Sequence, residues 1–89
     1  MALDAKPVLT VRVLAFARLR ELLGFGERGL SVAAGTTVEA LWTRLVSDAP
    51  ALAPLRTSTR FARNGALVAA GTLLSDGDEI ALLPPVGGG

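Results

Sequence analysis

The sequence predicts a small α+β roll in which a mixed sheet of about five strands packs on one main helix. Three observations lead to this fold class: an alternating β-branched run near the start, one strongly amphipathic stretch in the middle, and several short strand-like runs after it. The chain has 89 residues, which suffices for one such domain with one core. We expect residues 1–83 to form this domain and residues 84–89 to form an extended tail.

The first predicted element is a strand over Val8–Phe16. Leu9, Val11 and Val13 alternate there with polar residues, and period two in a β-branched run indicates a strand with one buried face. At Phe16 the apolar period changes to that of a helix. We therefore expect a corner between strand and helix at this residue.

The helix that follows is predicted to be short. Apolar residues in FARLRELLG recur at helical spacing, and Gly24 lies where a helix C-cap favours a left-handed residue. A glycine-punctuated turn, GFGERG, comes next and fits no phosphate-binding fingerprint. A brief second strand then places Leu30 and Val32 on its inward face.

The strongest local pattern belongs to the main helix. Thr36 and Glu39 have the spacing of a capping box, in which each side chain satisfies a backbone N–H of the first turn. The helix is expected to end near Asp48, because Pro50 cannot continue it. We predict an irregular connection after it, with room for one helical turn. The apolar stripe that we assign to the core comprises Val38, Leu41, Trp42, Leu45 and Val46.

Two turn signals divide the last third of the chain. The Asn-Gly pair at 64–65 lies between two strand-like runs and is typical of a type I′ hairpin. The Asp-Gly-Asp stretch at 76–78 predicts a second turn, which we expect to carry solvated charges. A final strand follows, with Ile80 and Leu82 on the core face, and it ends before Pro84 because proline cannot donate to a ladder.

The residue types that are absent limit the chemistry. The chain contains no Cys, no His and no Tyr, which excludes disulfides, a thiol nucleophile, an imidazole base and the usual zinc ligands. The net charge is +1 and the arginines are dispersed, so we expect no nucleic-acid partner. The acidic turn lacks the longer pattern of a calcium loop, so we expect no bound metal. The chain is therefore predicted not to be an enzyme by itself.

The distribution of apolar residues along the chain also predicts where in the cell the protein is located. No apolar run of useful length precedes Asp4 and Lys6, so we expect no signal peptide. No stretch approaches the roughly 18 apolar residues of a membrane-spanning helix. We expect a soluble protein of the cytoplasm with no membrane partner.

The sequence ends on LLPPVGGG. Two prolines favour an extended path that has little entropy left to lose on docking. Glycines have no Cβ, so they can thread a channel that is too narrow for other residues. A terminal carboxylate can react with ATP to form an acyl-adenylate, which activates it. The alternative is an idle, frayed end. We predict a threading role for Pro84, Pro85, Gly87 and Gly88, and we assign the reacting carboxylate to Gly89.

Four segments together resemble the small, sulfur-carrying subunits of molybdopterin synthases: AFARLRELLG, TTVEALWTRL, LSDGDEIALLPPV and the terminal Gly-Gly. The resemblance covers Val8–Gly89, and its most specific part is PPV-x-GG placed directly after DGDEIALL. These subunits are ubiquitin-like proteins with the β-grasp fold. The chain departs from their pattern at Arg63, where the family more often has an aliphatic residue.

The resemblance implies a function for the tail. A ubiquitin-activating-type adenylyltransferase would use ATP and Mg to adenylate Gly89, and a persulfide sulfur donor would convert the adenylate to a thiocarboxylate. The tail would then enter the large, catalytic subunit of the synthase, in a heterotetramer. There its sulfur would pass to the cyclic pyranopterin precursor to form the molybdopterin dithiolene. This chain would bind no cofactor of its own.

Large apolar residues near the tail are candidates for partner contacts. By strict alternation Leu83 points away from the core, next to the tail. The resemblance implies partner contacts at matching positions, whereas the alternative is that scattered exposed apolar residues have no function. The interface that we predict comprises Leu83, Leu67, Phe16 and Val86.

Other functions share the same features. A sulfur carrier for the thiazole of thiamine or for tRNA thiolation uses the same activated Gly-Gly end, although the PPV lead-in and the length favour the molybdopterin carrier. A ubiquitin-like modifier would join Gly89 to a lysine of a target protein. A β-grasp binding module with an idle tail is the remaining alternative.

Overall fold

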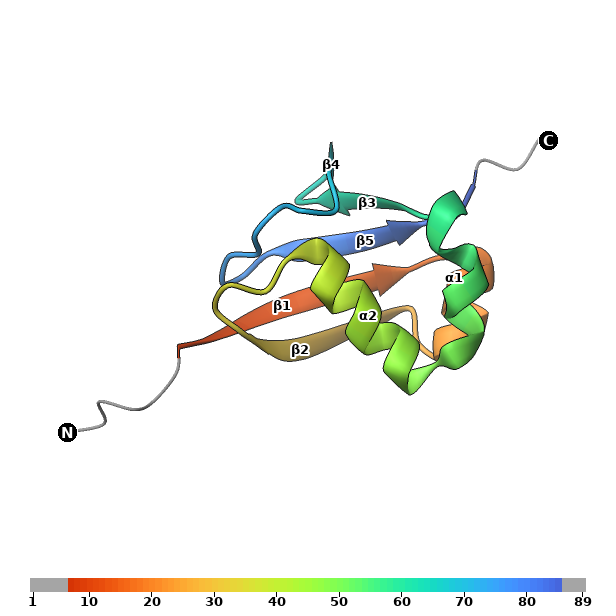
Figure 1. Cartoon of the computed structure of the whole chain (residues 1–89), viewed down its shortest axis with the longest axis horizontal. Helices are drawn as coiled ribbons and strands as arrows, with labels where there is room; N and C mark the ends of the chain where they lie inside the picture. Colours follow the sequence, from red (N-terminus) through yellow and green to blue (C-terminus); the bar gives the residue numbers. More distant parts are fainter. Residues whose placement is uncertain (1–6, 86–89) are drawn as a thin grey trace.

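The computed structural model describes residues 7–85. One five-stranded mixed sheet forms, with strand order β2-β1-β5-β3-β4, and helix α2 crosses one of its faces (Figure 1). The strands are β1 (Val8–Ala15), β2 (Glu27–Ala33), β3 (Arg60–Arg63), β4 (Ala66–Val68) and β5 (Glu79–Leu83). The helices are α1 (Ala17–Leu23), α2 (Val38–Asp48) and the 3₁₀ helix η1 (Pro50–Ser58). The α+β roll predicted from the sequence is confirmed.

The centre of the sheet is the parallel pair of β1 and β5, in which Val13 lies opposite Ile80. Antiparallel β2 flanks β1, and antiparallel β3 flanks β5, so the first and last strands of the domain lie side by side (Figure 1). The β3–β4 hairpin completes the sheet. Among residues 7–85 there is no helix of the length and apolarity needed to cross a membrane.

The core lies between the sheet and α2. Val11 and Val13 of β1 and Ile80 of β5 are at most 1% exposed, so the predicted alternation is confirmed. The Trp42 ring meets Phe61 of β3 edge-on, with ring centroids 6.0 Å apart. From α2 the buried residues are Val38, Leu41, Trp42 and Leu45, whereas Val46 is half-buried.

The turns are those that the sequence predicts. Gly24 ends α1 in the left-handed conformation (φ 83°), and its N–H donates to the Arg20 carbonyl. In the β3–β4 hairpin Asn64 and Gly65 both have positive φ, 50° and 88°, as a type I′ turn requires. Gly77 also has a positive φ, 84°, in the turn before β5.

The capping-box prediction is wrong by one residue. Thr37 is the N-cap of α2, and its Oγ1 accepts a hydrogen bond from the Ala40 N–H at 3.1 Å. Thr36 instead donates from Oγ1 to the Ala33 carbonyl at 2.6 Å. Because the helix begins one residue later than predicted, Glu39 lies at its second position and is free to bind elsewhere.

The connection after α2 is also more ordered than predicted. It forms the nine-residue helix η1, with Pro50 in its first turn and Pro54 inside it. Such long 3₁₀ helices are uncommon. Leu52 is completely buried, so tertiary packing stabilises what local propensity does not. Just after the helix, the Thr59 hydroxyl donates to the Leu55 carbonyl at 2.7 Å.

The central strand pair predicts a clear stability difference. We expect Ile80→Ala to lower the free energy of unfolding by about 2–5 kcal/mol, because it leaves a cavity between the sheet and the helix. Leu73→Ala is the control, since Leu73 is 59% exposed, and it should cost at most about 0.5 kcal/mol. Urea unfolding followed by circular dichroism measures both. Equal losses would contradict the central place of Ile80 in the core.

Candidate partner-binding face and tail root

The sheet presents its second face away from α2, and a row of apolar side chains crosses it. Leu14 of β1 lies opposite Ala81 of β5, Ala81 lies opposite Ala62 of β3, and Ala62 lies opposite Leu67 of β4. Residues directly opposite in a sheet point to the same side. These four residues are called the outer-face row below, and Leu67, at its end, is 63% exposed.

Three of the predicted interface residues lie on this outer face. Leu83 follows Ala81 by two residues and is half-buried. Phe16 follows Leu14 by two residues, its backbone is extended (φ −128°, ψ 153°), and its side chain is 45% exposed. Leu67 and Leu83 share one groove, whereas Phe16 lines a separate hollow beside Leu14. Their role in partner binding stays a prediction, and Val86 lies outside the described residues.

The groove that Leu67 and Leu83 share lies where the tail leaves the domain. We call it the tail-root groove; its volume is about 580 Å³. A second cavity, of about 110 Å³, is lined by the same two prolines together with residues of α1 and η1. The tail therefore starts against η1. The groove is lined by Thr57, Ser58, Arg60, Leu67, Leu83, Pro84 and Pro85.

Of the residues predicted to thread a partner's channel, only Pro84 and Pro85 are described. Pro84 is half-buried and Pro85 is exposed, and both follow the end of β5 directly. Gly87, Gly88 and Gly89 lie outside the described residues, so the predicted roles of the glycines are not tested by the structure.

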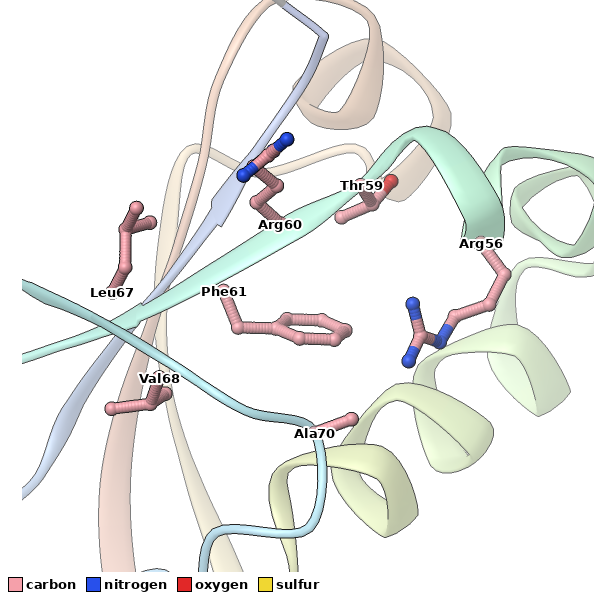
Figure 2. Close-up of a pocket in the computed structure, with 7 residues that line it drawn as sticks. All are labelled: Arg56, Thr59, Arg60, Phe61, Leu67, Val68 and Ala70. Atoms are coloured by element: carbon pink, nitrogen blue, oxygen red, sulfur yellow. The ribbon is translucent and has the colours of Figure 1, made fainter.

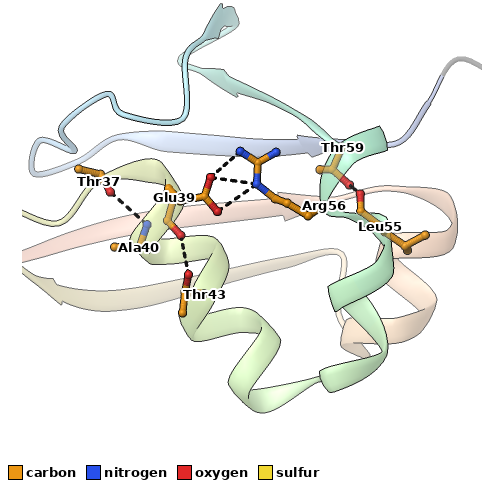
Figure 3. A network of polar contacts seen from close by, with 7 residues as sticks. All are labelled: Thr37, Glu39, Ala40, Thr43, Leu55, Arg56 and Thr59. Carbon is orange, nitrogen blue, oxygen red and sulfur yellow. Dashed lines mark hydrogen bonds and ion pairs between the residues drawn. The ribbon is translucent and has the colours of Figure 1, made fainter.

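An ion pair ties η1 to the start of α2. The Arg56 Nε donates to both carboxylate oxygens of Glu39, at 2.9 and 3.0 Å, and Nη2 adds a third hydrogen bond (Figure 3). The same guanidinium lies 4.9 Å from the centroid of the Phe61 ring, which points toward it in Figure 2. Both side chains are partly exposed. This contact fixes η1, and with it one wall of the tail-root groove.

The electrostatics of this pair follow from its geometry. The hydrogen bonds from Arg56 lower the pKa of the Glu39 carboxyl, and partial burial opposes them more weakly. The hydrogen bonds to Glu39 correspondingly raise the pKa of Arg56. Glu39 is thus a carboxylate across the physiological range.

The acidic turn before β5 is structural, and the expectation of solvated charges there is wrong for one residue. Asp78 is only 6% exposed. Its carboxylate accepts hydrogen bonds from the Ser75 N–H at 2.8 Å and from Asn64 Nδ2 at 3.1 Å. Asp76 accepts from the Thr10 N–H at 2.7 Å. Within residues 7–85 no three acidic side chains converge as metal ligands would.

Sequence reasoning missed the polar side of the tail-root groove. Arg60 lies opposite Leu83, on the outer face, and lines the groove. Alternation in RFAR could have placed Arg60 on the face opposite Phe61. The exposed Thr57 could not have been found in this way, because η1 itself was not predicted.

A comparison with family models gives a match over residues 13–89, so it includes the outer-face row, the groove and the tail as far as Gly89. The model is that of the ThiS family. This chain belongs to the ThiS family. The match extends over the whole C-terminal part of the chain, in which the most specific sequence features lie.

A curated relative of this chain has a stated function. The molybdopterin synthase sulfur carrier subunit of Escherichia coli is 44% identical over 82 residues, which cover 89% of this chain and 99% of that protein. The resemblance that the sequence motifs indicate is thereby confirmed.

Solved structures resemble the fold across most of the chain. The small archaeal modifier protein 1 from Methanosarcina acetivorans matches with a TM-score of 0.78 and 32% identity, covering 93% of this chain and 99% of that one. A chain in the complex of subunits 1 and 2 of the molybdopterin-converting factor from Helicobacter pylori matches with a TM-score of 0.61 and 28% identity, covering 91% and 100%. The predicted β-grasp, ubiquitin-like fold is confirmed.

The Glu39–Arg56 pair predicts a pH-dependent contribution to stability. The folded-state pKa of Glu39 lies below its ordinary value of 4.5, so the contribution is fully present above that value and is lost as the pH falls through the lower, folded-state pKa. Wild type should therefore be more stable than Glu39→Gln near neutral pH, and the difference should shrink on acidification below 4.5. Denaturant unfolding at a series of pH values measures it.

The matched control for this series is Glu21→Gln. Glu21 is exposed and makes only a loose contact with Arg18, at 3.9 Å. The Glu21→Gln variant should therefore have the same pH profile of stability as the wild type. If the two variants gave the same profile, the pair between α2 and η1 would not contribute as described.

Proposed function

We propose that this chain is the sulfur carrier subunit of a molybdopterin synthase. The observation that carries the proposal is its 44% identity to the Escherichia coli subunit of that name, over 99% of that protein. The absence of Cys and His from the sequence agrees with a carrier, because a carrier needs no nucleophile or base of its own.

Gly89 carries the chemistry in this proposal. A carboxylate oxygen leaves poorly until reaction with ATP forms an acyl-adenylate and releases pyrophosphate. A persulfide sulfur then displaces AMP, and a thiol cleaves the resulting S–S bond to leave a thiocarboxylate. A glycyl carbonyl suits these steps because it offers the least steric hindrance. ATP, Mg and the persulfide belong to the activating partners, and we place the exchange in the cytoplasm.

The proposed acceptor is the large subunit of the synthase, which would hold the active site. The tail would deliver its sulfur there to the cyclic pyranopterin precursor, and two deliveries would complete the dithiolene. The likeness to a subunit of the Helicobacter pylori complex supports a two-subunit assembly. Because the outer face surrounds the root of the tail, its apolar residues would face the large subunit.

The test is the intact mass of the chain after incubation with ATP and Mg, the cognate adenylyltransferase, a persulfide donor and a thiol that can cleave the acyl disulfide. We expect a product heavier by the mass difference between sulfur and oxygen. A variant lacking Gly88 and Gly89 should gain no mass, because the reacting carboxylate is misplaced, while its circular dichroism stays that of the wild type. Gly71→Ala, a change at an exposed glycine with free space around it, is the control and should react normally. An unmodified wild type would contradict the carrier function.

A second candidate function is that of a ubiquitin-like protein modifier. The likeness to small archaeal modifier protein 1, at 32% identity, favours it specifically. The same activated Gly89 would then form an amide with a lysine side chain of a target protein.

The modifier function predicts covalent conjugates in cells of the source organism. A tagged chain should appear in species of higher mass, and their tryptic peptides should contain a lysine joined to Gly89. These species should vanish when Gly88 and Gly89 are deleted. Conjugates in the absence of any thiocarboxylate would favour the modifier over the sulfur carrier.

A further inference from the structure

Charge is distributed unevenly over the outer face. At the end far from the tail, Arg12 is neutralised on the sheet itself: it lies 3.0 Å from the Glu27 carboxylate and 2.9 Å from that of Glu79. At the tail root, Arg60 is exposed, and among residues 7–85 no carboxylate lies within ion-pair distance of it. Arg60 is therefore an exposed cation beside the tail that is available to an external partner.

The residues around Arg60 indicate which chemical groups a partner needs in order to bind there. Arg60 shares the tail-root groove with the apolar side chains of Leu67, Leu83 and the two prolines. The exposed Thr57 on the same rim carries a hydroxyl that can donate a hydrogen bond. The Ser58 hydroxyl already donates to the Leu55 carbonyl at 3.2 Å. A planar guanidinium fork with a hydroxyl nearby matches a carboxylate, and the apolar floor matches an aliphatic or aromatic side chain next to it.

We infer that Arg60 is a specificity-determining residue for the protein into which the tail inserts, and that this partner places an aspartate or glutamate, flanked by an apolar side chain, in the tail-root groove. The inference rests on the proposed function, which makes that protein the large synthase subunit. Pro84 and Pro85 line the groove and also begin the tail, so a protein that encloses the tail also covers the groove.

The chain's own carboxyl end is the competing occupant. Residues 86–89 follow Pro85 in the sequence, and fully extended they span up to about 14 Å. Arg60 paired with the terminal carboxylate would be closed to the partner until the tail moved. The experiment must therefore separate an intermolecular carboxylate from this internal one.

The test compares binding of wild type, Arg60→Ala and Arg60→Lys to the purified cognate large subunit by calorimetry at low and high salt. We expect Arg60→Ala to bind about tenfold more weakly at low salt, with a smaller difference at high salt because the interaction is screened. Arg60→Lys should recover part of the loss. Arg28→Ala removes the same charge from the edge strand β2, which β1 and β5 separate from β3, and should bind as wild type does. Thermal unfolding checks that the variants fold.

A charge reversal identifies the partner group. Arg60→Glu should weaken binding further than Arg60→Ala, and changing the matching acidic residue of the large subunit to lysine should restore it. Equal binding by wild type and Arg60→Ala would overturn the inference and leave the proposed function intact. A wild type that does not bind the large subunit at all would overturn the proposed function, and the inference with it.

A measurement on the free chain tests whether its own terminal carboxylate occupies the tail-root groove. The Arg60 side-chain NMR signal should be the same with and without residues 86–89 if the groove awaits a partner. A clear shift on deleting these residues would show that the terminal carboxylate occupies the groove, and would overturn the inference.

Discussion

The parallel pairing of β1 with β5 is the constraint on which the rest of the structure depends. It places the first and last strands of the domain at the centre of the sheet, with Val13 and Ile80 side by side and fully buried. Parallel strands cannot be joined by a tight turn, so the intervening chain must cross over, and α2 makes that crossing on the core side. The opposite face is left uncovered as a consequence. The tail emerges from the middle of the sheet because β5 lies there.

Different contacts hold β5 at its two ends. Before the strand, Asp78 binds Asn64 of the hairpin turn and the Ser75 backbone. After the strand, the prolines lie against η1, which the Arg56–Glu39 pair fastens to α2. The strand that leads into the tail is thus held at its start by hydrogen bonds to the buried Asp78 carboxylate, which leave that carboxylate paired, and at its end by apolar contacts of the prolines.

Those elements whose pattern is local could be predicted from the sequence. The alternation in β1 and β5, the stripe of α2 and the Asn-Gly turn are each contained in a few consecutive residues, and the structure confirms them. The helix cap was misplaced because two adjacent threonines have the same capping chemistry, and only tertiary packing decides between Thr36 and Thr37. Helix η1 could not be predicted because prolines are unfavourable inside a helix. The burial of Leu52, which stabilises η1, depends on residues distant in sequence. The same distinction applies to the candidate site. The local alternation in β5 predicted that Leu83 points outward, whereas the tail-root groove depends on η1 and could not be predicted.

The outer-face row has a consequence for the shape of any protein that covers it. Its two central members, Ala62 and Ala81, carry a single methyl group each, while the larger Leu14 and Leu67 lie at its ends. The middle of the face is therefore a low saddle between the two leucines, in which Ala62 is only 7% exposed and Ala81 is half-buried. A longer side chain at either alanine would raise the saddle and hold a covering protein away, even though no polar contact was lost. Recognition of this face therefore depends on the small size of the Ala62 and Ala81 side chains as well as on polar contacts.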